Sequence, residues 1–223
     1  MTTEAEQMQT RYDKRKQLDQ SSLNYKLYDH LIRAEREEKF IRFLHQHKVN
    51  LREAVCLEIG AGTGGNLGFF FRLGAKPGNV FANELLPDRQ QHLREHFPHV
   101  QLIPGDATEL NMARRFDVIL VSTVFSSVLD NAAREQLAKA IASFLSERGV
   151  LLWYDFVYDN PKNPDVKGMP LRDVKQMFSP LKISGTYNVT LLPPLGRMFP
   201  NQYHLLNGLL PFLRTHVACA FVR

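Results

Sequence analysis

The sequence has few cysteines and no long apolar segment. Only two of its 223 residues are cysteines, Cys56 and Cys219, and each lies in a short apolar run. This low number argues against a disulfide-stabilised scaffold, and we expect both thiols to be free and buried. No apolar run approaches the roughly 18 residues that a membrane-spanning helix needs, so we expect no membrane span.

Targeting and metal-binding patterns are missing as well. The first 16 residues are polar and charged and lack the apolar core of a secretory signal, so we expect a cytoplasmic protein. The eight histidines are scattered and no Cys/His spacing resembles a metal site, so we expect no metal. The length fits one domain, and we assign residues 1–24 to an N-terminal arm and residues 25–223 to the domain.

The excess of positive charge is small. The chain has 28 Lys and Arg residues against 23 Asp and Glu residues, a net charge of +5. The densest basic cluster, Arg11 to Lys16, also contains Asp13. A solvated surface explains this pattern better than a nucleic-acid interface, so we do not expect a nucleic-acid partner.

What the sequence does contain is a glycine-rich turn. A short apolar run from Val55 ends at Glu58-Ile59, is followed by four glycines between Gly60 and Gly65, and leads into an apolar run at Leu67. This order predicts a strand, a tight turn and a helix start, with glycine allowing positive φ and a close approach of a ligand. The spacing departs from the full G-x-G-x-x-G of dinucleotide-binding proteins because Gly65 comes one residue early. We expect a nucleotide-type ligand at the carboxyl edge of a parallel sheet.

Three more strand-like runs follow, at residues 80–84, 102–107 and 116–122. The first ends at Glu84 and the second ends in Gly105-Asp106. Runs that alternate with helical segments and end in acids are typical of α/β sheets that bind ligands at their carboxyl edge.

Together, these features resemble the class I S-adenosylmethionine-dependent methyltransferases. The resemblance rests on the glycine motif from Glu58 to Gly64, on Glu84, on Asp106 and on the segment 116–127. More narrowly, the chain resembles small methyltransferase-type-11-like proteins, through the segments Trp153 to Val166 and Pro211 to His216. The resemblance covers about residues 25–223. It is specific for the cofactor but not for the methyl acceptor.

The resemblance and the pattern of elements imply one fold class. We expect an α/β, Rossmann-like, doubly wound sheet of seven strands, mostly parallel with an antiparallel last strand, and helices on both faces. The expected strands are residues 54–59, 80–84, 100–103, 117–121, 150–156, 181–192 and 216–222. The expected helices are residues 25–47, 66–73, 87–97, 131–145 and 173–178. In the first helix we expect Glu35 to Lys39 to form a solvated face, and we expect Asn131 to cap the helix that it begins.

The resemblance also implies a cofactor, S-adenosylmethionine, with S-adenosylhomocysteine as product, and roles for matching positions. Glu84 would accept the ribose hydroxyls, Asp106 would meet adenine, and Glu58 would hold the glycine loop or the cofactor's ammonium group. The other expected cofactor-binding residues are Gly60, Ala61, Gly62, Asn66, Leu85, Ala107, Ser122 and Thr123.

Three residues are candidates for the base that accepts the acceptor's proton. Asp155 ends a strand on the expected active edge, while Tyr154 should face the other way. His216 begins the last strand, and His204 lies in the segment 193–215. That segment is either a lid over the acceptor or a packed helical insertion. Tyr12 and Arg15 share a helical face and are candidates to close the site.

We therefore expect a methyltransferase acting on a small molecule or a glycan or lipid precursor, at oxygen, by in-line displacement. An RNA or protein methyltransferase and a non-catalytic cofactor-binding protein are the alternatives. An NAD-dependent dehydrogenase is disfavoured by the glycine spacing. The oligomeric state stays open.

Overall fold

The computed structural model describes residue 10 and residues 22–110, 112–159 and 163–223. Tyr12 and Arg15 therefore lie outside the described residues. No helix in the described ranges is long and apolar enough to cross a membrane.

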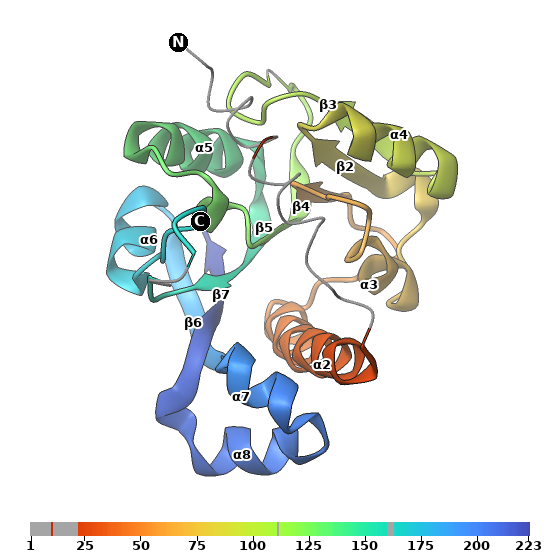
Figure 1. Cartoon of the computed structure of the whole chain (residues 1–223). Helices are drawn as coiled ribbons and strands as arrows, with labels where there is room; N and C mark the ends of the chain where they lie inside the picture. Colours follow the sequence, from red (N-terminus) through yellow and green to blue (C-terminus); the bar gives the residue numbers. More distant parts are fainter. Residues whose placement is uncertain (1–9, 11–21, 111, 160–162) are drawn as a thin grey trace.

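Seven strands form one sheet, in the order β3-β2-β1-β4-β5-β7-β6 (Figure 1). The strands are β1 (Cys56–Ile59), β2 (Val80–Glu84), β3 (Gln101–Pro104), β4 (Phe116–Ser122), β5 (Leu145–Phe156), β6 (Lys182–Leu191) and β7 (Arg214–Val222). The first five pair in parallel, and β7 runs antiparallel to both β5 and β6. The predicted fold class is confirmed, including the antiparallel last strand.

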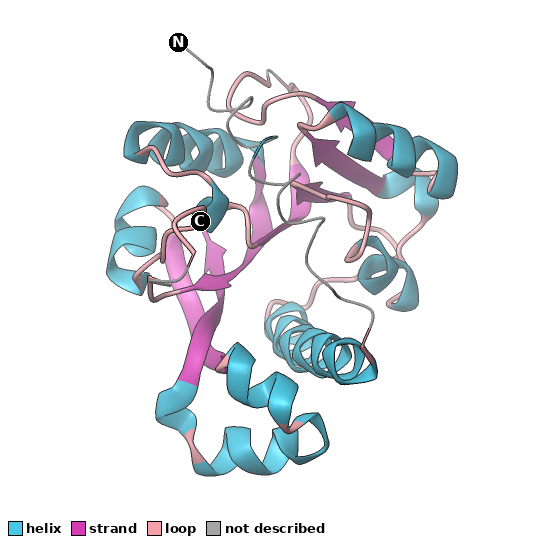
Figure 2. Cartoon of the chain, in the orientation of Figure 1, coloured by secondary structure: helices cyan, strands magenta, loops and turns pink. Residues whose placement is uncertain are grey.

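Helices cover both faces of this sheet (Figure 2). On one face lie α2 (Leu23–Gln46), α3 (Leu67–Arg72) and α4 (Pro87–His96), and on the other lie α5 (Asn131–Phe144) and α6 (Leu171–Met177). The chain between β6 and β7 forms α7 (Pro193–Met198) and α8 (Tyr203–Leu209), which lie below the sheet in Figure 1.

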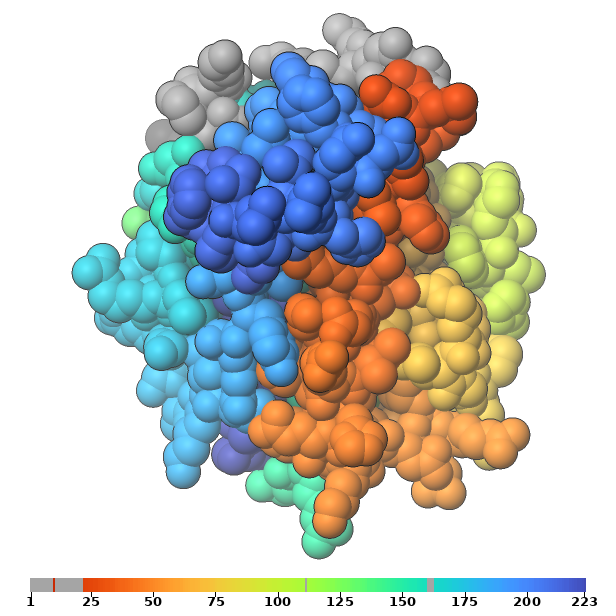
Figure 3. Space-filling view, turned by 90° about the horizontal axis from the view of Figure 1, so that it is seen from below, coloured from red at the N-terminus to blue at the C-terminus, as the bar shows by residue number. Residues whose placement is uncertain are grey.

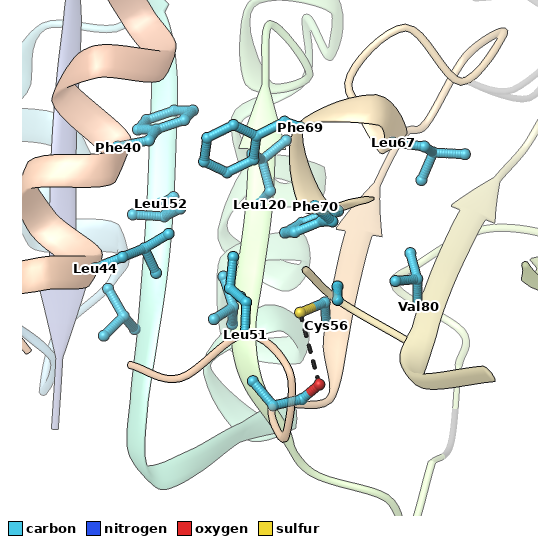
Figure 4. Packing of buried hydrophobic residues seen from close by; sticks show 14 of the residues in the cluster. Phe40, Leu44, Leu51, Cys56, Leu67, Phe69, Phe70, Val80, Leu120 and Leu152 are labelled. Atoms are coloured by element: carbon cyan, nitrogen blue, oxygen red, sulfur yellow. Dashed lines mark hydrogen bonds between the residues drawn. The ribbon is translucent and has the colours of Figure 1, made fainter. Parts of the chain in front are cut away.

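Alternation along the central strands divides the apolar core into two layers. Leu120 and Leu152 pack with Phe40 of α2 and Phe69 of α3, as Figure 4 shows. The intervening residues, such as Trp153, pack on the opposite face against α5 and α6. Because both faces are covered, the middle of each of these strands is buried, which explains its continuous apolar sequence. Cys56 and Cys219 are free and buried, as predicted.

Local signals fix the helix starts. Ser22 and Asp130 are the N-caps of α2 and α5, accepting hydrogen bonds from the amides of Tyr25 and Ala133 at 3.2 and 2.7 Å. The prediction that Asn131 caps α5 is therefore wrong by one residue. Asp130 takes the cap because its backbone is extended while Asn131 is already helical.

Candidate functional site

A cavity of about 800 Å³ opens at the carboxyl ends of β1, β2 and β4. Eleven of the predicted site residues line it: Gly60, Ala61, Gly62, Asn66, Glu84, Leu85, Asp106, Ala107, Ser122, Thr123 and His216. The fold brings these residues together because parallel strands end at one edge. Glu58 lies buried behind this wall, whereas Asp155 and His204 are not among the lining residues.

The glycine turn between β1 and α3 has the backbone that its sequence predicts. Gly60 and Gly62 have φ of 66° and 60°, a region that side chains rarely adopt. A Cβ added to Gly60 would lie 2.7 Å from Val124 Cγ2. The amide of Gly62 donates to Glu84 Oε2 at 2.6 Å. The turn is therefore fixed against the neighbouring strand and exposes backbone to the cavity.

Two polar residues at the end of β2 organise this edge. Glu84 accepts one hydrogen bond on each carboxylate oxygen, from Gly62 and from the Leu86 amide, the latter at 2.9 Å. Asn83 donates to the carbonyls of Ile103 and Gly105 at 3.0 and 2.9 Å. This contact fastens the loop that carries Asp106. Asn83 is not among the predicted site residues, although it directly precedes the acid at the strand end.

The Asp106 carboxylate is oriented by its own loop. Its Oδ1 accepts hydrogen bonds from the backbone amide and the hydroxyl of Thr108, both at 2.8 Å. Such a side-chain turn is the ordinary role of Asp after a strand. Here the turn also places Asp106 in the cavity wall.

A buried polar chain joins α2 to β1 and β4. Arg36 donates to Asn66 Oδ1 at 2.6 Å and to Ser122 Oγ at 2.9 Å, and its guanidinium lies over the Tyr154 ring at 5.1 Å. Asn66 in turn donates to Glu58 Oε1 at 2.6 Å. Burial lowers the pKa of Arg36 and raises the pKa of Glu58 to about 8. Two buried atoms of this chain, Arg36 Nε and Glu58 Oε2, have no hydrogen-bond partner among the described residues.

Arg36 corrects the expected solvated face of α2, because its side chain is only 8% exposed. It lies on the same helical face as Phe40, Phe43 and Leu44, all of which are buried. The spacing i, i+4, i+7, i+8 was the signal that could have found it. A charged residue on an apolar helical face often marks a functional site.

Glu58 should make stability depend on pH between about 6.5 and about 8. Its pKa is about 8 in the folded protein against an ordinary 4.5, so in this window only the folded state holds the proton. The free energy of unfolding therefore falls as pH rises. His216 has the opposite effect only below its ordinary pKa of 6.5, since burial lowers its folded pKa to about 3.

Urea unfolding followed by circular dichroism at several pH values tests this expectation. Glu58→Gln should remove the fall in stability across the window, while Glu53→Gln, at an exposed neighbouring position, should retain it. An unchanged slope in Glu58→Gln would show that Glu58 does not titrate there.

His216 faces the cavity from the start of β7. Its ring stacks on Tyr154 with 4.9 Å between ring centroids and meets the edge of Phe156 at 5.0 Å. Its Nδ1 lies 2.9 Å from the hydroxyl oxygen of Thr215. Burial lowers the pKa of His216 to about 3, so the imidazole is neutral near pH 7.

Asp155 and Tyr154 do face opposite sides of β5, but Tyr154 is the one that lines the cavity. The carboxylate of Asp155 is fully buried and accepts from the amides of Ser126 and Phe156 at 3.0 and 2.9 Å. Burial raises its pKa to about 6. This geometry gives Asp155 a role in fixing the segment after β4.

The 193–215 segment reaches the cavity through Arg197 of α7. Its guanidinium lies over the rings of Tyr25 and Tyr28, at 4.8 and 5.8 Å from their centroids. His204 is exposed on α8. Of the two histidine candidates, the fold brings only His216 to the cavity.

Comparison with known proteins agrees with this arrangement. Residues 56–149, from β1 to the middle of β5, match a family described as a methyltransferase domain. No curated protein matches the chain in sequence.

Solved structures share the fold at low sequence identity. An S-adenosylmethionine-dependent methyltransferase from Clostridium acetobutylicum has a TM-score of 0.60 and 15% identity, over 87% of this chain and 95% of that one. The glycopeptide N-methyltransferase MtfA has a TM-score of 0.59 and 14% identity, over 83% and 90%. A TehB-like methyltransferase from Corynebacterium glutamicum has a TM-score of 0.56 and 17% identity, over 85% and 98%.

MtfA has been solved with S-adenosylmethionine, with S-adenosylhomocysteine and with sinefungin. The cavity described above lies at the carboxyl edge of the strands, where sheets of this class bind their ligands. The central part of the chain thus matches a methyltransferase domain, and most of the chain shares the fold of S-adenosylmethionine-dependent methyltransferases.

Proposed function

We propose that the protein methylates a hydroxyl group of a small molecule or of a glycan or lipid precursor. The observation that carries this proposal is the position of the His216 imidazole, in the cavity wall with the Thr215 hydroxyl 2.9 Å from its Nδ1. A hydroxyl acceptor must lose its proton during transfer, and an imidazole in the cavity wall is placed to take it. The low pKa of His216 makes it a weak base, so its position carries the proposal and its pKa does not.

The residues of the cavity fit the cofactor. Glu84 and Asp106 offer carboxylate oxygens at the strand ends, where ribose hydroxyls and an adenine amine need acceptors. The positive φ of Gly60 and Gly62 leaves backbone accessible beside them. We propose that these residues, with Ala61, hold the nucleoside half.

The methionine half would meet the buried polar chain. The guanidinium of Arg36 lines the cavity and suits a carboxylate. Glu58 lies behind the wall and would act on the ammonium group through Asn66, to which it is hydrogen-bonded. We propose that Asn66 keeps both side chains in place, since it is hydrogen-bonded to each, and that Ser122 holds Arg36 alone. Leu85, Ala107 and Thr123 complete the wall.

When bound, the cofactor supplies a methyl group on a positively charged sulfur, which needs no further activation. The chain's main task is then to orient the two reactants and to remove a proton. The Thr215 hydroxyl at His216 Nδ1 orients the imidazole, and Tyr154 supports its face. With Arg197 in the cavity wall, we propose that the 193–215 segment covers the acceptor end.

An amine acceptor is the second candidate. One similar fold belongs to a glycopeptide N-methyltransferase, and a protonated amine also has to lose a proton before it can attack. Incubation with methyl-labelled cofactor and a panel of phenols, sugars, lipid alcohols and amines separates the two. Label on hydroxyl compounds is expected, and label found only on amines, RNA or protein would overturn the proposal.

The role of His216 makes its own prediction. His216→Gln should lower kcat for a labelled acceptor by about a hundredfold, because glutamine cannot take the proton. Binding of S-adenosylmethionine should be unchanged. His204→Gln is the matched control and should keep full activity, since His204 is exposed on α8. Equal kcat values in the two variants would remove His216 from the mechanism.

A further inference from the structure

The 193–215 segment is apolar on its solvent side. Five large apolar side chains there are between 44% and 73% exposed. We call them the C-terminal apolar patch: Met198, Phe199, Leu205, Leu209 and Phe212. Figure 3 shows this segment, in blue, as one face of the molecule beside the start of α2. Exposed apolar residues that gather in this way mark an interaction surface.

The patch is held in place from its inner side. On α8, Tyr203 and Asn207 lie one turn apart and donate to the carboxylate of Glu35 at 2.6 and 2.7 Å. Leu205 and Leu209 are also one turn apart and are exposed on the outer side. The inner side of the helix also carries Leu206, which packs on the cluster of Tyr28 and Leu191, so α8 has apolar residues on both sides. The exposed leucines on its outer side favour an apolar partner there.

In the described part of the chain, the unpaired charges beside the patch are cations. Arg214, which follows α8, donates to the Asn207 carbonyl at 2.8 Å. The acid Asp29 on α2 is paired with Arg33 at 2.7 Å. Arg197, between the patch and the cavity, is exposed, and so is Lys26 on α2, which contacts α7. Apolar side chains bordered by cations suit a surface of anionic lipids. The apolar side chains enter the bilayer, and the cations meet the headgroups. Self-association through this patch would instead bring like charges together.

We propose that the C-terminal apolar patch docks on the surface of an anionic lipid bilayer. Because Arg197 lies next to the patch and lines the cavity, docking holds the cavity near the membrane surface. The docking rests on the patch alone. Delivery of a lipid-linked acceptor to the cavity rests also on the proposed function.

Co-sedimentation with vesicles tests the docking. The protein should bind vesicles of phosphatidylcholine with phosphatidylglycerol, and bind phosphatidylcholine vesicles more weakly. High salt should weaken binding to the anionic vesicles. Leu209→Ser with Phe212→Ser should reduce the partition coefficient by about tenfold or more. Ile41→Ser with Tyr158→Ser, which changes exposed apolar residues outside the patch, should leave it unchanged.

Titration of each variant with S-adenosylmethionine keeps this test separate from the proposed function. Loss of vesicle binding with cofactor binding preserved supports the patch as the docking surface. No binding of the unmodified protein to anionic vesicles would overturn the proposal, as would equal losses in both double variants. A concentration-dependent dimer that only the patch variant abolishes, without vesicle binding, would assign the patch to a second copy and overturn it as well.

Discussion

Glu84→Ala should weaken binding of S-adenosylmethionine by about a hundredfold or more. The carboxylate holds the amides of Gly62 and Leu86 at 2.6 and 2.9 Å, so its loss frees the glycine turn. It also removes the acceptor that we propose for the ribose hydroxyls. Hydrogen bonds to a charged group are each worth about 1.5–3 kcal/mol. Two of them correspond to at least about a hundredfold in affinity.

Isothermal titration calorimetry measures this effect directly. Glu84→Gln keeps the size of the side chain but loses its charge. Its affinity for S-adenosylmethionine should lie between those of the unmodified protein and Glu84→Ala. Glu95→Gln, at an exposed position on α4, is the matched control. Wild-type affinity in Glu84→Ala would contradict the assigned cofactor site. Thermal unfolding of each variant shows whether a loss of binding comes from a loss of fold.

Glu35→Ala should lower the free energy of unfolding by about 3–5 kcal/mol. The Glu35 carboxylate accepts hydrogen bonds from the Thr190 amide, the Tyr203 hydroxyl and the Asn207 side chain, at 2.9, 2.6 and 2.7 Å. A buried donor left without a partner costs about 1–3 kcal/mol. This loss is a large part of the roughly 5–15 kcal/mol that a domain has in total.

The same contact supports the cavity wall. Thr190 is fully buried, has a positive φ of 66°, and lies with its hydroxyl 2.8 Å from that of Tyr154. Releasing the Thr190 amide from Glu35 should therefore also disturb Tyr154 and the His216 ring stacked on it.

Urea unfolding of Glu35→Ala beside Glu38→Ala is the appropriate comparison. Glu38 is on the same helix, but its ion pairs with Lys39 and Arg42 are at the surface, so its loss should cost less than about 1 kcal/mol. Similar losses in the two variants would show that the buried cluster contributes no more than a surface ion pair.

Most of the fold could be predicted because its signals are local. The glycine turn after β1 and the acid at the end of β2 depend on a few neighbouring residues. The alternation of strands and helices then leaves little choice of topology. The predicted starts of β5 and β7 were less accurate than the predicted order of the elements. β5 begins at Leu145, five residues before the predicted start, because Leu145 pairs with Phe116 beyond a bulge that local sequence does not reveal.

The parts of the site that could not be predicted depend on contacts between distant elements. Arg36 belongs to a charged stretch in the sequence, and its burial follows from the way α2 packs over Ser122 and Tyr154. Tyr154 and Asp155 are neighbours near the end of β5, and only the packing of each face of the sheet shows that Tyr154 lines the cavity. The contacts of Glu35 with α8 span more than 160 residues and leave no pattern in the sequence.

The most direct test of the whole account is calorimetric titration of the unmodified protein with S-adenosylmethionine and, in parallel, with NAD. We predict saturable binding of S-adenosylmethionine to one site and no binding of NAD. Binding of NAD in place of S-adenosylmethionine, or of neither ligand, would contradict the assignment of the cavity to the methyl donor.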